Sequence, residues 1–321
     1  MSAFVSTTGP VAIIDIGSNS IKVLIATRAP NGDIVPVKVR TLDARISAGI
    51  NQAAPRLSEE GMQRGVTAIA TLLGDASAAG ASAFTLVATS AVRDALNGED
   101  FRARVKAATG ETIRILSGDE EANLIGRGLV TDPALRHLED FYVFDLGGGS
   151  LECLSFRARR IEQAVSVRLG CVRLTERFVA DPQRPMTPAE IAAISAHTRE
   201  VVTQSGFNFS LAETAVAVGT GGTVATARAI LGGREGRPFE ATASTITLAQ
   251  MRALRDGITA LPLEERKKVA GMPPARADVF PTALVTLIAL AELGGFTGFQ
   301  NSLHNLRYGL ADATLAPGKA Q

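Results

Sequence analysis

One aspartate in this sequence ends an apolar run and is separated from three consecutive glycines by a single leucine. The run is residues 142–144, the aspartate is Asp145, and Ser150 follows the glycines at 147–149. Glycines let the backbone adopt positive φ and approach a ligand, so successive N–H groups can converge on phosphate oxygens while a carboxylate holds the accompanying cation. The pattern predicts a phosphate-binding hairpin, and a glycine turn that binds no ligand is the alternative interpretation.

The same pattern occurs a second time near the amino terminus. Residues 11–26 align with residues 141–156 without a gap, which places Asp15 on Asp145. A third glycine turn, at residues 219–223, follows another apolar run. Internal repeats usually indicate duplicated structural units. The sequence therefore predicts two similar halves that face one another across a shared site.

Strands and helices must hold these turns in place, and the hydrophobic pattern predicts where they lie. Apolar runs at residues 11–14, 21–26 and 34–39 predict a first half that begins with strands. A buried strand at residues 84–88 leads into a helix. Arg93 then lies at a strand-to-helix corner, on the side where open α/β sheets bind ligands.

Length and composition limit the class of protein. The chain has 321 residues, of which 46% are hydrophobic, and this length favours two domains. The polar segment 132–140 predicts the boundary, which gives domains at residues 1–132 and 133–302. A net charge of +1 argues against nucleic acid as a partner. The absence of a run of about 18 apolar residues argues against a membrane span.

Cysteine and histidine usage argues against a metal site built on these residues. The two cysteines, Cys153 and Cys171, lack the spacing of a zinc ligand pair, and the three histidines are scattered. A buried apolar role is expected for Cys153. A reducing compartment and an amino terminus without a signal-peptide pattern predict a cytoplasmic protein.

Several segments together carry a resemblance to a known family. They read DIGSNSIKVLIA, ATSAVRDA, LSGDEEANLIGRG, FDLGGGSLE, GTGGT, ARAD and LRYGL in chain order. This series resembles the exopolyphosphatase and guanosine pentaphosphate phosphohydrolase (Ppx/GppA) family, within the superfamily of actin, sugar kinases and heat-shock ATPases. The resemblance implies an α/β fold of two ribonuclease H-like (actin-like ATPase) domains with a cleft between them. It also implies the short two-domain form, with a helix near residues 303–321 that packs back on the first domain.

The candidate site residues divide by chemistry. Carboxylates suit Mg²⁺ or Mn²⁺, so the metal-ligand candidates are Asp15, Asp145 and Glu152. Glu152 would return to the end of the hairpin where Asp145 lies only if the turn were wide. The phosphate-binding candidates are Gly17, Ser18, Asn19, Ser20, Lys22, Gly147, Gly148, Gly149, Ser150, Gly221 and Arg307.

Two further residues are the catalytic candidates. The guanidinium of Arg93 would brace the transferred phosphoryl group, because its fork matches two phosphate oxygens. The resemblance assigns Glu121 the task of orienting the attacking water. Acids in a first helical turn also complement the helix dipole, which alone explains Asp119 and Glu120.

The resemblance implies a phosphohydrolase that releases terminal orthophosphate from inorganic polyphosphate. The 5′-terminal phosphate of guanosine pentaphosphate is a second candidate substrate. The family's habit leads us to expect a homodimer. Two alternatives stay open: an ATP-dependent kinase or ATPase of the same superfamily, and a non-catalytic sensor that binds polyphosphate or guanosine alarmones.

Overall fold

The computed structural model describes residues 9–48, 50 and 54–316, and the chain divides into two compact units. Unit 1 comprises the chain up to Arg136 together with the part from His304 onward, and unit 2 comprises His137–Leu303. The boundaries expected from the sequence, after residues 132 and 302, lie near these positions.

Unit 1 is built on a five-stranded sheet with the order β3-β2-β1-β4-β5. Its strands are β1 (Val11–Ile16), β2 (Ile21–Arg28), β3 (Ile34–Leu42), β4 (Ala83–Ala88) and β5 (Ile113–Ile115). Its helices are α1 (Glu59–Ala78), α2 (Ser90–Asp94), α3 (Gly98–Thr109), α4 (Gly118–Val130) and α11 (Leu306–Thr314). The first three strands are antiparallel, and β4 and β5 run parallel to β1. The predicted start with strands is confirmed.

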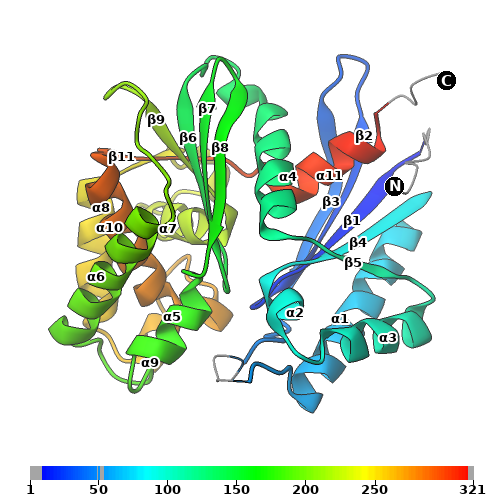
Figure 1. Ribbon diagram of the computed structural model, residues 1–321, viewed down its shortest axis with the longest axis horizontal. Helices are drawn as coiled ribbons and strands as arrows, with labels where there is room; N and C mark the ends of the chain where they lie inside the picture. Colours follow the sequence, from blue (N-terminus) through cyan, green and yellow to red (C-terminus); the bar gives the residue numbers. More distant parts are fainter. Residues whose placement is uncertain (1–8, 49, 51–53, 317–321) are drawn as a thin grey trace. The chain divides into compact units, whose positions relative to one another are not determined.

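Alternation along β1 gives the sheet of unit 1 two different faces. Ala12, Ile14 and Ile16 belong to one core with residues of α1 and α3. Ile13 and Asp15 point to the opposite face, because successive strand side chains alternate. Helix α11 packs against β1 and β2 and against α4 (Figure 1). Asp15 is thus held at the end of a strand that is buried on both faces.

Unit 2 repeats this plan with one strand added. Its strands are β6 (Phe141–Leu146), β7 (Leu151–Arg157), β8 (Arg160–Val167), β9 (Val216–Thr220), β10 (Thr245–Thr247) and β11 (Gly298–Asn301). Its helices are α5 (Cys171–Phe178), α6 (Pro188–Gln204), α7 (Gly221–Arg234), α8 (Leu248–Thr259), α9 (Leu263–Arg266) and α10 (Phe280–Gly294). The order is β10-β11-β9-β6-β7-β8, with β9 and β11 parallel to β6. The duplication read from the sequence therefore extends to strand order and direction.

Helix starts and the buried apolar helix of unit 2 are found where the sequence predicts them. Thr187 and Thr247 form capping boxes with Glu190 and Gln250 at the starts of α6 and α8. Helix α10 is apolar nearly all round and is buried in the core of this unit. Within the described ranges, no helix has both the length and the apolar character to cross a membrane.

Two glycines allow α4 and α11 to cross closely in unit 1. A Cβ built on Gly128 would overlap the Asn305 carbonyl oxygen, and one built on Gly309 would overlap the Leu124 carbonyl oxygen. The glycine of the LRYGL segment therefore has a packing role. This crossing fixes α4, whose first turn carries Glu121.

Candidate functional site

The two glycine turns close with the same hydrogen bond. The Gly17 N–H donates to the Ser20 carbonyl at 3.2 Å, and the Gly147 N–H donates to the Ser150 carbonyl at 3.0 Å. Each turn joins the first two strands of its unit. The sequence repeat therefore corresponds to two equivalent turns, one in each unit.

The start of α5 holds the carbonyl groups of the second turn. The Gly147 carbonyl accepts from the Cys171 N–H at 3.0 Å, and the Gly148 carbonyl accepts from the Val172 N–H at 2.9 Å. Helix N-termini carry N–H groups without an intrahelical partner. These two carbonyls satisfy three of them, because the Gly148 carbonyl also accepts from the Arg173 N–H at 3.2 Å. The helix therefore sets the orientation of the turn's peptide planes.

The third carbonyl of the turn is held as well. Arg173 donates from Nε to the Gly149 carbonyl at 3.1 Å, and a Cβ on Gly170 would overlap the Gly148–Gly149 peptide. In a trans peptide the C=O and the following N–H point in opposite directions. The N–H groups of Gly148, Gly149 and Ser150 therefore point away from α5, as a phosphate cradle requires.

In unit 1 residues 45–47 hold the carbonyl groups of the first turn. The Ser18 carbonyl accepts from the Ser47 N–H and hydroxyl, at 3.3 and 3.1 Å, and the Asn19 carbonyl accepts from the Arg45 N–H at 2.9 Å. The N–H groups of Asn19 and Ser20 therefore point away from residues 45–47. The Asn19 Nδ2 is buried and has no hydrogen-bond partner in the described part of the chain. The first turn thus offers both main-chain N–H groups and a side-chain amide as donors to an anion.

Two carboxylates lie directly opposite one another in unit 2. Asp145 on β6 pairs with Glu152 on β7, and the Ser166 hydroxyl donates to Glu152 at 2.8 Å. Directly paired residues of an antiparallel ladder share a face of the sheet and lie close together. Our expectation that Glu152 needs a wide turn to reach this end is wrong, because the tight turn itself sets the two residues in register. In unit 1 the corresponding pair is Asp15 and Lys22.

The carboxylate pair suits a hard divalent cation. Mg²⁺ is usually bound through one or two carboxylates and completes its shell with water and substrate phosphate oxygens. Asp145 and Glu152 supply that number. Within the described residues no group of three or more His, Cys, Asp and Glu side chains could hold a metal. A cation at this position would therefore depend on water and substrate for its other ligands.

The third glycine turn lies against Asp145 on β6 and against Arg276. Gly221 adopts φ +78°, and a Cβ on it would overlap the Asp145 carboxylate. The Arg276 guanidinium lies against Gly222, and its Nη2 donates to the Thr223 hydroxyl at 3.3 Å. The Arg276 Nε is buried without a hydrogen-bond partner among the described residues. Sequence reasoning assigned no role to Arg276, and its only signal was its place in the ARAD segment.

The two catalytic candidates form an ion pair in unit 1. Arg93 Nη1 lies 3.0 Å from Glu121 Oε2 and also donates to the Leu116 carbonyl at 2.9 Å. Glu121 is 6% exposed. The hydroxyl of Ser90, at the start of α2, lies 3.3 Å from that of Ser18 in the first turn. The corner that carries Arg93 therefore contacts both the first glycine turn and the start of α4.

The acids that precede Glu121 have other surroundings. Glu120 closes a capping box with Ser117 and pairs with Arg114. The Ser117 N–H, and next the Arg114 guanidinium, hold the pKa of Glu120 below its usual value. Asp119 is exposed. Glu121 is thus the one buried acid of this turn, and it faces a cation.

Arg307 lies in the interior of unit 1, beside β2. It is 8% exposed, and its Nη1 lies 3.5 Å from the Val23 carbonyl. Both cysteines are buried, and burial raises the pKa of each thiol. The phosphate role of Arg307 stays a prediction, as does the expectation that the two sets of loops face one another.

Comparisons with known proteins agree on one family. Residues 24–309 match the model of the Ppx/GppA phosphatase family. An exopolyphosphatase from Cytophaga hutchinsonii ATCC 33406 is 23% identical, with 95% of this chain and 97% of that one covered and a TM-score of 0.85. The Aquifex aeolicus member of the Ppx/GppA family is also 23% identical, with 98% and 99% covered and a TM-score of 0.77. An exopolyphosphatase-like protein is 25% identical, with 94% and 97% covered and a TM-score of 0.82. The predicted α/β fold of two domains built on the same plan is confirmed.

Proposed function

Because this chain belongs to the Ppx/GppA phosphatase family, we propose that it releases terminal orthophosphate from inorganic polyphosphate. Family membership makes the protein a phosphatase. The substrate is supported by similar structures that are described as exopolyphosphatases, and by two turns that repeat one main-chain geometry with N–H groups available to an anion. A polymer of identical phosphates suits two equivalent cradles.

The observation that carries the proposal is the ion pair between Arg93 and Glu121. A hydrolase needs a group that orients water, whereas a kinase must position a different acceptor. Glu121 is a buried carboxylate whose position is fixed by a cation and by the first turn of α4. In the proposed reaction the Glu121 carboxylate accepts a hydrogen bond from the attacking water.

Arg93 contributes to the same step by binding the phosphoryl group rather than the water. Its guanidinium fixes Glu121 and presents further N–H donors, which would stabilise the negative charge on the equatorial oxygens of the terminal phosphoryl group. Water attacks the terminal phosphorus in line, and the P–O bond to the rest of the polyphosphate breaks. The products are orthophosphate and a polyphosphate that is one phosphate shorter. Preorganised donors of this kind commonly contribute about 10²–10³ in rate.

The turns and the carboxylates hold the substrate for this step. The N–H groups of residues 148–150 would bind phosphate oxygens in unit 2, and those of residues 19–20 would do so in unit 1. Arg276 adds a cation beside Gly222 in unit 2. Asp145 and Glu152 would hold Mg²⁺ or Mn²⁺, with Asp15 as the corresponding carboxylate of unit 1. A bound cation supplies neutralisation of phosphate charge.

The test compares substrates for the same protein. Orthophosphate release is measured with polyphosphate, guanosine pentaphosphate and ATP, each with Mg²⁺ and with EDTA. We expect release from polyphosphate, with guanosine pentaphosphate as a second substrate through its 5′-terminal phosphate, and loss of both in EDTA. Tight binding of polyphosphate without any release would show a sensor instead. Transfer of the ATP γ-phosphate to a sugar would show a kinase.

A further inference from the structure

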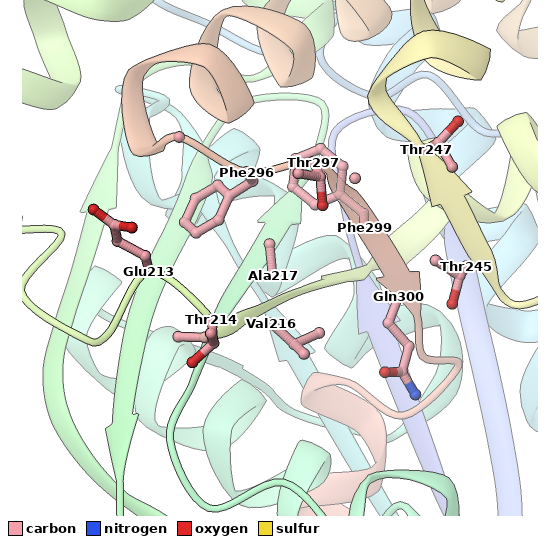
Figure 2. A pocket seen from close by; sticks show the side chains of 13 residues that line it. Glu213, Thr214, Val216, Ala217, Thr245, Thr247, Phe296, Thr297, Phe299 and Gln300 are labelled. Atoms are coloured by element: carbon pink, nitrogen blue, oxygen red, sulfur yellow. The ribbon is translucent and has the colours of Figure 1, made fainter.

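Unit 2 contains a pocket of about 300 Å³ that the proposed reaction does not use. It lies between β9, β10 and β11, and the segments 213–217 and 295–300 form most of its wall. Figure 2 shows Phe296 and Thr297 on one side of the pocket and Thr245 and Thr247 on the other. Its volume is at the lower end of the range typical of small-molecule sites.

The strand pairing explains why the pocket forms. Strand β11 pairs with β9 only at Gln300 with Val218 and at Asn301 with Gly219. The residues that precede these on both strands line the pocket. Since the two strands are parallel, the pocket lies at their amino-terminal ends. The glycine turns follow the carboxyl-terminal ends of β6 and β9, so the pocket is separate from the phosphate-binding loops.

The lining combines hydroxyl groups with an apolar floor. Four threonines, Thr214, Thr245, Thr247 and Thr297, lie around it. Thr247 is engaged in the capping box of α8. The hydroxyls of Thr214, Thr245 and Thr297 have no protein hydrogen-bond partner in the described ranges, so they can bind a ligand. Ala217 and Phe296, which keep a small exposed surface, supply the apolar floor.

The charge of the lining excludes several ligand classes. Of the described residues that form the pocket, Glu213 is the single ionisable one, and no Lys, Arg or His is among them. A phosphate would therefore meet repulsion without compensation. A metal ion would find one carboxylate and no second charged ligand. A neutral or cationic molecule rich in hydroxyl groups remains.

We propose that this pocket binds a monosaccharide and prefers an amino sugar to its neutral counterpart. The threonine hydroxyls and the Gln300 amide would bond the sugar hydroxyls. The exposed part of Phe296 would contact the C–H face of the sugar, and Glu213 would attract the ammonium group. The order of affinity that follows is D-glucosamine, then D-glucose, with D-glucose 6-phosphate not bound.

Calorimetric titration of the full chain with these three sugars tests the proposal. The variant T245V/T297V removes two hydroxyls at exposed positions without changing side-chain shape, and we expect about tenfold weaker binding of both sugars that bind. Thr203→Val, at an exposed site on α6, is the matched control and should bind like the parent. Glu213→Gln should remove the preference for glucosamine, which we expect to be about threefold because the carboxylate is exposed.

Competition separates this site from the phosphate loops. Saturating polyphosphate should leave glucosamine affinity unchanged. The proposal is overturned if neither glucosamine nor glucose binds, if glucose 6-phosphate binds as well as glucose, or if T245V/T297V and Thr203→Val bind alike. Displacement of glucosamine by polyphosphate would likewise overturn it, since the sugar would then occupy the loops.

Discussion

At the scale of single residues, Gly221 shows how closely the loops are built around the acids. Its φ of +78° favours glycine, and any side chain at this position would overlap the Asp145 carboxylate. Two separate reasons therefore require a glycine here: the backbone conformation and the space that Asp145 occupies. The two reasons can be tested apart by comparing Gly221 with another glycine that has the same positive φ but free space around an added Cβ.

We predict that Gly221→Ala displaces Asp145 and lowers orthophosphate release from polyphosphate at least tenfold. It should also reduce the free energy of unfolding by about 1–3 kcal/mol, through positive φ and the overlap together. Gly206→Ala is the control, because Gly206 has the same φ of +78° with nothing within 4 Å of the added Cβ. It should cost about 1 kcal/mol and leave activity unchanged. Equal activity in the two variants would contradict the role given to Asp145.

At the scale of elements, the crossing of α4 and α11 is what holds Glu121 in place. Gly128 and Gly309 remove the side chains that would keep these helices apart. The two helices come from distant parts of the sequence, and both belong to unit 1. The carboxyl-terminal helix therefore stabilises an element that carries a catalytic candidate.

We predict that Gly309→Ala forces this crossing apart and lowers the free energy of unfolding by about 1–3 kcal/mol, as overpacking usually does. The matched control is Gly74→Ala near the end of α1, where an added Cβ meets nothing within 4 Å. There the better helix propensity of alanine should raise stability by up to about 1 kcal/mol. Urea denaturation of both variants is the measurement. If both variants gained stability, the crossing of α4 and α11 would have space for an added methyl group, and the prediction would be wrong.

The glycine turns depend on elements that sequence patterns identify only in part. The repeat predicts both turns, and the capping signals predict the starts of α6 and α8. Periodicity does not show that α5 and residues 45–47 hold the turn carbonyls, because these contacts are main-chain bonds between distant segments. The short strands β10 and β11 lack a long alternating pattern and were not predicted. The pairing of Asp145 with Glu152 requires the register of the hairpin.

At the scale of the whole molecule, the chain re-enters unit 1 at His304. The ring of His304 stacks on Tyr308 with centroids 3.7 Å apart, and its Nδ1 lies 2.8 Å from the Thr131 hydroxyl. Burial lowers the pKa of His304, and the nearby charge of Asp132 offsets this in part. The folded protein therefore holds this histidine neutral at a pH where the unfolded chain already binds a proton.

The sign of the pH dependence follows from this shift. Above the unfolded pKa of about 6.5 the neutral ring costs nothing, and as the pH falls below it the unfolded state is favoured by proton uptake. We predict that stability falls between pH 7.5 and pH 5.5, and that His304→Gln reduces this fall. Burial also lowers the pKa of His197, so part of the fall should remain. Urea unfolding at both pH values is the measurement, and an unchanged fall in the variant would contradict this role.

The most direct test of the whole account is the turnover of polyphosphate by Glu121→Gln beside Glu120→Gln. Glutamine at 120 can still close the capping box, so we expect that variant to stay within about twofold of the parent. Glutamine at 121 keeps the shape but loses the negative charge that orients water, and kcat should fall at least about 100-fold with a small change in KM. If Glu121→Gln retains more than about a tenth of the parental kcat, Glu121 does not orient the attacking water.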